Sequence, residues 1–293
     1  MAQGLVKRAT LALLLLAARL ACAQGFAADL SFPAQPSPLA ADTPVAMALF
    51  KPEGEGPFPA LVLVHQCGGL GRENRRNESM LEWARQAVAR GYVALLVDAL
   101  GPRGVQSVCM GPRNGVTFGR GVTDALQAVD HLRSLPYVAR ERVAIAGWSW
   151  GAMVATLSSS RTGRYYARRG PTFAAAVAFY PGCFTIRPQG SAPYEIVNRD
   201  IDRPLFVLLG GRDVETPPAD CTSRLEAAKA RGAPVEWHEY PEATHCWDCR
   251  NLDGFRKVDI RGTTVEYRYD ADATLDSARR MFEFLERAMP AKR

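Results

Sequence analysis

The sequence predicts an α/β protein in which a mostly parallel central sheet is covered by helices on both faces. Short segments that are apolar throughout alternate along the chain with segments of one-sided, helical apolar spacing. Continuous apolar strands are typical of a parallel sheet buried on both faces, and the alternation predicts right-handed crossovers through helices. Hydrophobic residues make up 47% of the 293 residues, enough for a large core. There is no internal repeat and no long linker, so we predict one domain over residues 45–290.

The first 23 residues are predicted to be a cleavable signal peptide. Lys7 and Arg8 form a basic start, Leu11–Ala18 forms a short apolar stretch, and Ala21–Ala23 reads Ala-x-Ala. This pattern predicts cleavage after Ala23, and the apolar stretch is too short to span a membrane. We therefore expect a periplasmic or secreted protein.

Removal of the signal peptide would leave a chain with a modest positive charge. It takes away three basic residues and no acidic ones, so the formal net charge falls from +6 to +3. No basic run interleaved with aromatic residues accompanies this charge, so nucleic acid is not an expected partner. No later segment is apolar over the length that a membrane span needs, so none is expected in the mature chain.

Six of the seven cysteines follow the signal peptide: Cys67, Cys109, Cys183, Cys221, Cys246 and Cys249. An even number in an exported protein predicts disulfides, but counting alone leaves many pairings open. The Cys246-x-x-Cys249 pair also admits a redox dithiol, or a zinc site with His245 and Asp248. However, no thioredoxin-like βαβ setting surrounds it, and a zinc-bound His245 could not act as a base. We expect structural disulfides.

The strands are predicted from short apolar runs that end at turn residues. Residues 24–44, rich in Ala, Pro and Ser, are expected to lead into the domain, with an edge strand at 29–32. The further predicted strands are 45–50, 60–64, 93–97, 143–147, 173–179, 205–209 and 235–240.

The helices are predicted from apolar residues three or four positions apart. The segments 80–90 and 122–135 have this spacing and end before Gly91 and Pro136. Glycine is typical of the residue after a helix, and proline cannot continue one. The other two predicted helices are 150–157 and 275–289.

The segment Gly147-Trp148-Ser149-Trp150-Gly151 matches Gly-x-Ser-x-Gly at a strand-to-helix turn. Glycines at both ends let the strand and the helix approach closely, so that the serine is exposed at the edge of the sheet. The N-terminus of the following helix points free N–H groups at an anion formed beside it. We therefore interpret Ser149 as a nucleophile; the alternative is a structural turn.

The loop after the 60–64 strand reads His65-Gln66-Cys67-Gly68-Gly69. Acyl transfer needs two donors for the oxyanion that forms from a carbonyl. We expect one from the Trp150 N–H, directly after the nucleophile, and the other from the Cys67 N–H, with Gln66 as the alternative. A plain glycine turn is the other interpretation of this loop.

Asp213 follows the 205–209 strand and Gly210-Gly211, at the edge where reactive groups of a parallel sheet gather. An acid there would hold a histidine in the correct tautomer and stabilise its charged form. Glu215 and Asp220 are alternatives, but we expect both on the surface of the following turn and helix. Asp213 itself is also compatible with a simple turn.

His245 lies in the loop after the 235–240 strand and is the best placed of four histidines to exchange a proton with Ser149. His131 falls in a predicted helix and His238 in a predicted strand. His65 is expected to brace its loop. The order Ser, Asp, His along the chain is typical of α/β-hydrolases.

The chain resembles the dienelactone hydrolase family of the α/β-hydrolase superfamily. The motifs that carry the resemblance are His65–Leu70, Asp98–Gly104, Gly147–Gly151, Phe179–Gly182, Gly211–Asp213 and Ala243–His245. The resemblance implies an α/β-hydrolase fold and the triad Ser149, His245 and Asp213. It also implies disulfides Cys67–Cys109 and Cys183–Cys221, which leave Cys246 for Cys249.

The sequence departs from the family at four places, one of them minor, Ala152 in place of a second glycine in the turn at Ser149. Enzymes that act on dienelactone itself carry cysteine as the nucleophile, which argues against that substrate for a chain with Ser149. Gln66 stands where many hydrolases have glycine. Cys246–Cys249 replaces the apolar residue and phenylalanine that usually follow the histidine.

The sequence thus predicts an exported serine hydrolase that cleaves a small-molecule ester or lactone, with no cofactor and no metal. A serine peptidase or an acyltransferase on the same fold is an alternative within enzymes. A binding module that kept the fold without its chemistry is the alternative outside enzymes.

Overall fold

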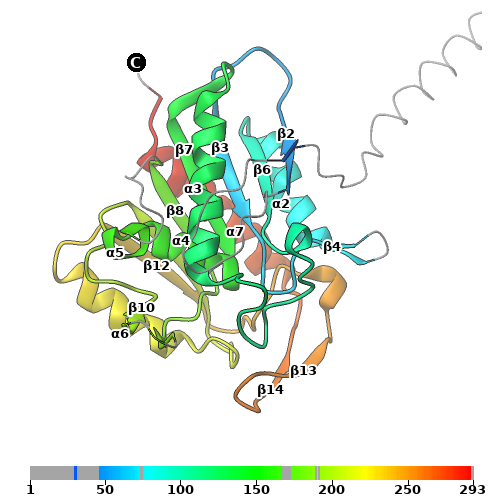
Figure 1. The fold of residues 1–293 in the computed structure, drawn as a ribbon, viewed down its shortest axis with the longest axis vertical. Helices are drawn as coiled ribbons and strands as arrows, with labels where there is room; N and C mark the ends of the chain where they lie inside the picture. The colour runs from blue at the N-terminus through cyan, green and yellow to red at the C-terminus, as the bar shows by residue number, and fades with distance from the viewer. Residues whose placement is uncertain are drawn as a thin grey trace, which may run out of the picture.

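The computed structural model describes residues 30–31, 46–72, 75–165, 173–188, 190 and 192–291 (Figure 1). The predicted signal peptide lies outside these residues. So does the lead-in segment, apart from the short strand β1 (Leu30–Ser31), which falls inside the predicted edge strand. Among the described helices, none combines the length and the apolar character needed to cross a membrane.

Eight strands form one sheet in the order β1-β2-β6-β3-β7-β8-β11-β12. The strands β1 and β2 pair antiparallel at one edge, β2 is antiparallel to β6, and all other pairs are parallel. The bounds are β2 Ala46–Phe50, β3 Phe58–Val64, β6 Val93–Asp98, β7 Val138–Trp148, β8 Ala175–Phe179, β11 Leu205–Gly210 and β12 Val235–Tyr240. The predicted mostly parallel sheet is confirmed.

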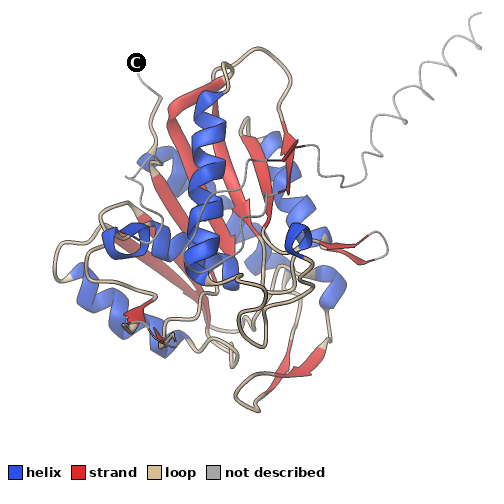
Figure 2. Cartoon of the chain, viewed as in Figure 1, coloured by secondary structure: helices blue, strands red, loops and turns tan. Residues whose placement is uncertain are grey.

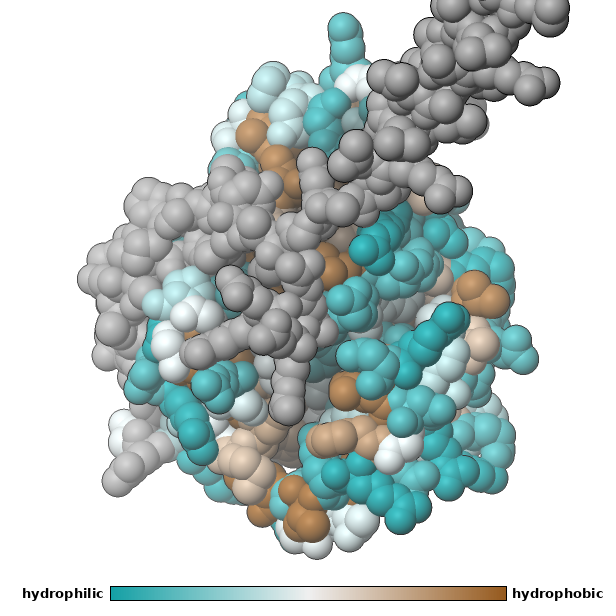
Figure 3. Space-filling view, turned by 90° about the vertical axis from the view of Figure 1, so that its right-hand side faces the viewer, coloured by the Kyte–Doolittle hydropathy of each residue, from teal (hydrophilic) through white to brown (hydrophobic). Residues whose placement is uncertain are grey.

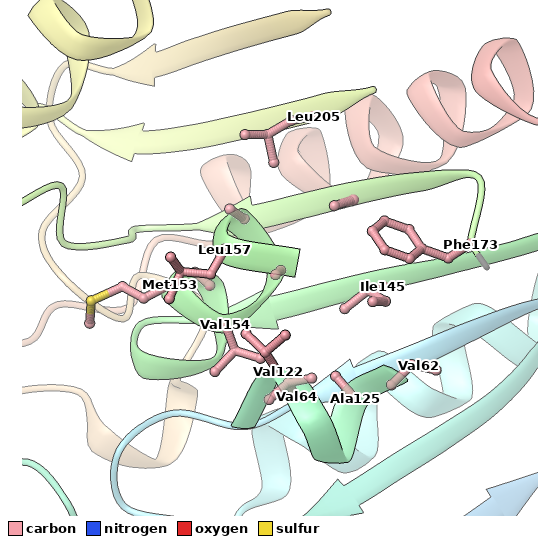
Figure 4. Packing of buried hydrophobic residues seen from close by; sticks show 14 of the residues in the cluster. Val62, Val64, Val122, Ala125, Ile145, Met153, Val154, Leu157, Phe173 and Leu205 are labelled. Atoms are coloured by element: carbon pink, nitrogen blue, oxygen red, sulfur yellow. The ribbon is translucent and has the colours of Figure 1, made fainter. Parts of the chain in front are cut away.

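Helices cover both faces of this sheet (Figure 2). One layer holds α3 (Phe118–Ser134), α4 (Trp150–Ser158), α5 (Arg161–Tyr165) and α6 (Pro218–Lys229); the other holds α2 (Glu78–Ala89) and α7 (Ala271–Ala288). Successive strand side chains point to opposite faces. Val62 and Val64 therefore pack with α3 and α4 (Figure 4), whereas Leu61 and Leu63 pack in the cluster that contains α2 and α7.

Two helices begin earlier than their apolar spacing predicts, and a capping side chain explains each start. The Thr117 hydroxyl accepts the Arg120 N–H at 3.2 Å, so α3 begins at Phe118. The Asp270 carboxylate accepts the Ala273 N–H at 2.9 Å, so α7 begins at Ala271. Such caps satisfy amides that have no partner within the helix.

Three two-stranded hairpins and two single-turn helices lie outside the sheet and were not predicted from the sequence. The hairpins are β4 (Gly71–Arg72) with β5 (Arg75–Arg76), β9 (Thr185–Ile186) with β10 (Tyr194–Glu195), and β13 (Arg256–Val258) with β14 (Thr264–Glu266); the helices are η1 (Gly101–Arg103) and η2 (Arg250–Leu252). The β13–β14 hairpin extends from the lower end of the molecule in Figure 1. On the face shown in Figure 3 the described residues are mostly hydrophilic, with apolar ones in small groups.

A buried ionic cluster joins η1 to α3. The Asp124 carboxylate accepts two hydrogen bonds from the Arg103 guanidinium, at 2.7 and 3.0 Å, and one from Arg120 Nε at 3.0 Å. The Asp124 side chain is 1% exposed, and burial raises its pKa against the attraction of both arginines. Arg103 also donates to the Ala99 carbonyl at 2.7 Å, so the cluster anchors the loop that follows β6.

We predict that Asp124→Asn lowers the free energy of unfolding by about 3–5 kcal/mol, because it leaves buried guanidinium charge without its carboxylate. Urea unfolding followed by circular dichroism measures the change. Glu82→Gln is the control, since Glu82 forms an exposed ion pair with Arg85 and should change stability by at most about 1 kcal/mol. Equal effects of the two substitutions would contradict the prediction.

Candidate active site

Ser149 lies in the tight turn between β7 and α4. Its φ of 53° and ψ of −112° are strained for a residue with a side chain. A Cβ on Gly147 would lie 2.0 Å from the Gly151 carbonyl oxygen, and one on Gly151 would lie 2.1 Å from the Val64 carbonyl oxygen. Only glycine fits at either end of this turn, as the motif predicts.

Ser149, His245 and Asp213 form one hydrogen-bonded row. The Ser149 Oγ lies 2.9 Å from His245 Nε2, and His245 Nδ1 lies 2.7 Å from Asp213 Oδ2. All three residues are buried. The structure thus brings together three side chains that come from the loops after β7, β11 and β12.

Asp213 is held by its own loop. Its Oδ1 accepts the backbone N–H groups of Glu215 and Thr216, each at 2.8 Å. The Thr216 hydroxyl donates to Asp213 Oδ2 at 2.7 Å and lies 3.2 Å from His245 Nδ1. These donors fix the direction of the carboxylate toward the imidazole.

The surroundings of His245 favour its charged form. Burial, the largest single influence, lowers the pKa of this imidazole. Attraction to Asp213 and Glu215, with the hydrogen bond to Asp213, outweighs burial and raises the pKa above its ordinary value, whereas Lys257 acts in the opposite direction. An imidazole with this balance is suited to accept a proton from a neighbouring hydroxyl.

The loop after β3 lies against the first turn of α4, because a Cβ on Gly151 would also lie 2.6 Å from the His65 carbonyl oxygen. This contact puts the loop that carries Cys67 beside the turn that carries Trp150. Within the described residues, neither the Cys67 N–H nor the Trp150 N–H donates a hydrogen bond to protein. Within this part of the chain, both amides are therefore available to donate to an oxyanion.

His65 links its loop to the loop after β6. Its Nε2 accepts the Ala99 N–H at 3.2 Å, and its Nδ1 lies 2.6 Å from the Gln66 carbonyl oxygen. Burial lowers the pKa of His65, which favours the neutral ring that these contacts need. The contacts agree with the bracing role expected from the sequence.

A buried polar network behind His245 was not predicted. The Tyr180 ring meets the His245 imidazole edge to face, with centroids 4.7 Å apart, and its hydroxyl donates to Asp248 Oδ1 at 2.6 Å. Asp248 Oδ2 accepts from Trp83 Nε1 at 2.7 Å and from the Ser79 hydroxyl at 3.0 Å. Burial raises the pKa of Asp248, and these hydrogen bonds oppose the rise. The sequence offered one signal, the motif that contains Tyr180.

The same network reaches the loop after β3. The Gln66 amide donates to the Tyr180 hydroxyl at 3.4 Å, and its oxygen accepts from the Asn77 side chain at 2.7 Å. Gln66 is the residue that replaces the usual glycine. Its side chain therefore connects this loop to the N-terminus of α2, which Asn77 caps.

The six cysteines of the domain form three disulfides: Cys67–Cys109, Cys183–Cys221 and Cys246–Cys249. These are the pairs that the family resemblance implies. Cys246, Asp248 and Cys249 are close enough in the described structure to be considered as metal ligands. With both sulfurs in a disulfide, however, this group offers no thiolate to a zinc ion.

The expected surface position of Glu215 is wrong. Its side chain is 15% exposed, and one carboxylate oxygen lies 3.8 Å from His245 Nε2. Lys257 and Tyr267, which belong to the β13–β14 hairpin and its exit, bind the same carboxylate. Asp220 is exposed in the first turn of α6, as expected. The error arose because the hairpin that covers Glu215 is distant in sequence and was not predicted.

Comparisons with known proteins agree with this fold. The structure is similar to Thermogutta terrifontis esterase 2 phosphorylated by paraoxon, with a TM-score of 0.62, 17% identity, and coverage of 90% of this chain and 96% of that one. It is also similar to a dienelactone hydrolase-like promiscuous phosphotriesterase, P91, from metagenomic libraries, with a TM-score of 0.61, 20% identity, and coverage of 84% and 93%. The chain therefore has an α/β-hydrolase fold.

The sequence comparisons identify the family. A protein from Methylorubrum extorquens described as "Putative carboxymethylenebutenolidase" is 25% identical over 214 residues, which cover 70% of this chain and 68% of that protein. The model of the dienelactone hydrolase family matches residues 45–289. This match covers most of the chain and every residue of the hydrogen-bonded row, so the chain is a hydrolase that belongs to the dienelactone hydrolase family.

Proposed function

We propose that the protein is an exported serine hydrolase that cleaves a small carboxylic ester or lactone. The observation that carries the proposal is the row Ser149 Oγ–His245 Nε2, His245 Nδ1–Asp213 Oδ2, with distances of 2.9 and 2.7 Å. A hydroxyl, an imidazole and a carboxylate in this order form the arrangement that activates a serine for attack on a carbonyl.

In the first half of the reaction, Ser149 Oγ attacks the carbonyl carbon while His245 Nε2 takes the hydroxyl proton. Asp213 stabilises the imidazolium that results. The N–H groups of Cys67 and Trp150 donate to the oxyanion, and each such donor typically contributes about 10²–10³ in rate. The tetrahedral intermediate then releases the alkoxide, which takes the proton back from His245 and leaves an acyl-enzyme.

In the second half, His245 takes a proton from water, and the resulting hydroxide attacks the acyl-enzyme carbonyl. Collapse of the second tetrahedral intermediate returns the proton to Ser149 and releases the acid. A lactone follows the same path, but its leaving hydroxyl stays attached to the acyl group. No step in this sequence requires a metal or an organic cofactor.

Export is supported by two independent features. The N-terminal segment has the pattern of a signal peptide. The domain also contains three disulfides, each next to a loop of the active site. Disulfides form and persist in oxidising compartments, which a protein reaches by export.

We predict that Ser149→Ala abolishes hydrolysis of a short p-nitrophenyl ester and labelling by a fluorophosphonate probe, while the fold remains intact by circular dichroism. The probe also distinguishes a serine enzyme from a binding module, because a binding module with unchanged sequence would not be labelled. A panel of esters, lactones and peptides then separates an esterase from a peptidase. Residual turnover above about a tenth of the original would refute Ser149 as the nucleophile, given the usual loss when a triad serine is removed.

We predict that Asp213→Asn lowers kcat strongly, by up to ~10⁴-fold, because asparagine removes the charge and holds the wrong tautomer of His245. KM should change less, since the lost interaction strengthens mainly in the transition state. Steady-state kinetics measure both constants. Asp220→Asn is the matched control on the exposed first turn of α6 and should keep near-normal kcat. A near-normal kcat for Asp213→Asn would exclude Asp213 from the triad.

We predict that protein isolated from the periplasm has almost no free thiols among the six cysteines of the domain. Thiol titration under denaturing, non-reducing conditions counts them directly. Four or more free thiols would contradict both the disulfides and the export that they support.

A further inference from the structure

The imidazole of His245 is flanked by carboxylates on both of its nitrogens. Asp213 binds Nδ1, whereas Glu215 Oε2 lies 3.8 Å from Nε2, the nitrogen that faces Ser149. Glu215 follows Asp213 by two residues, and its backbone N–H is bonded to the Asp213 carboxylate. One short loop thus supplies both negative charges, and the second lies where the transferred proton arrives.

The β13–β14 hairpin holds Glu215 in this position. Lys257 Nζ lies 2.7 Å from Glu215 Oε1, and the Tyr267 hydroxyl donates to Glu215 Oε2 at 2.9 Å. The Arg261 guanidinium donates to the backbone carbonyls of Val214 and Glu215 at 2.7 and 2.9 Å. Both the backbone and the carboxylate of Glu215 are therefore fixed by a segment outside the sheet.

Lys257 adds a positive charge beside the negative charge of Glu215. Its side chain is 20% exposed and its ammonium lies 5.2 Å from the centre of the Tyr267 ring, which itself lies beside His245. The pair therefore places a positive charge beside the carboxylate that lies 3.8 Å from Nε2. Glu215 raises the pKa of His245 by more than Lys257 lowers it, so the carboxylate dominates and the ammonium reduces its effect.

We propose that Glu215 and Lys257 are positioning residues that set the proton affinity of His245 from its Nε2 side. Glu215 stabilises the imidazolium formed when Ser149 loses its proton, and Lys257 limits that stabilisation. The role in catalysis rests on the proposed function; the electrostatic coupling itself does not.

The other groups that face His245 do not change charge near neutral pH. Tyr180 packs on one side of the ring and Tyr267 on another, and burial followed by a neighbouring carboxylate raises the pKa of each phenol. Thr216 is neutral, and Asp248 lies behind Tyr180. The charges that act on His245 are therefore Asp213, Glu215 and Lys257, in agreement with the influences on its pKa.

The test compares substitutions that remove opposite charges from one ion pair. Glu215→Gln keeps the shape and an acceptor for Tyr267, and Lys257→Met keeps the apolar stem. The pKa of His245 is measured by NMR titration of histidine-labelled protein, with its resonance assigned by His245→Asn. The acid limb of kcat/KM for a p-nitrophenyl ester gives a second measure of the same pKa.

We expect Glu215→Gln to lower the pKa of His245 by about one unit, the low end of the effect of an opposite charge within ~4–6 Å. Lys257→Met should raise the pKa by less, because Lys257 has the smaller influence on His245. The double variant should lie between Glu215→Gln and the original protein, below the original value, because the carboxylate has the larger effect. Glu242→Gln is the matched control: Glu242 is another carboxylate near the histidine loop, but it is 69% exposed and paired with Arg212, so solvent screens it. It should leave the pKa unchanged.

Shifts of the same sign in the two single variants, or no shift in either, would overturn the proposal, because a merely structural role of the ion pair predicts similar effects of both. If Glu215→Gln does not fold, the upward shift in Lys257→Met decides alone. If the two single variants move the pKa of His245 in opposite directions but the protein hydrolyses no ester, the electrostatic coupling is supported and the proposed function is refuted. Ester hydrolysis with an unmoved pKa would refute the coupling alone.

Discussion

The active site depends on the close approach of three backbone segments at the carboxyl end of β7. The strand, the first turn of α4 and the end of β3 are so close that a Cβ at Gly147 or Gly151 would overlap with main-chain atoms. Ser149, between these segments, has a positive φ, and its hydroxyl lies 2.9 Å from His245 Nε2. It also brings the loop after β3 beside the helix N-terminus, where two backbone amides lack protein acceptors within the described residues. The geometry of the nucleophile is thus a consequence of backbone packing.

The loops that carry the other site residues are held by bonds outside the sheet. Cys67–Cys109 secures the loop after β3, Cys183–Cys221 joins the segment after β8 to α6, and Cys246–Cys249 closes the turn directly after His245. The Tyr180–Asp248 hydrogen bond adds a buried link between the loops after β8 and β12. Loops are the most mobile parts of most folds. Covalent and buried polar links next to each of them reduce that freedom where hydrogen-bond distances must be maintained.

Groups with opposite effects on the pKa of His245 lie close together around its ring. Burial alone would disfavour the imidazolium, which the proposed reaction must form, and the adjacent carboxylates compensate for burial. The β13–β14 hairpin contributes Lys257 and orients Glu215, so a segment that adds nothing to the central sheet contributes to the electrostatics of the site.

The sequence by itself determined the mostly parallel character of the sheet, the turn at Ser149, and the order of Ser149, Asp213 and His245, because these rest on local patterns. Apolar runs, glycine spacing and strand ends are readable within a few residues. The disulfide pairs needed the family resemblance as well. Only the tertiary structure decided the position of Glu215, the Tyr180–Asp248 network and the role of Gln66 in joining the loop after β3 to α2. Each of these depends on a contact between segments far apart in the chain: Glu215 was expected at the surface until Lys257 and Tyr267, more than forty residues later, were seen to cover it.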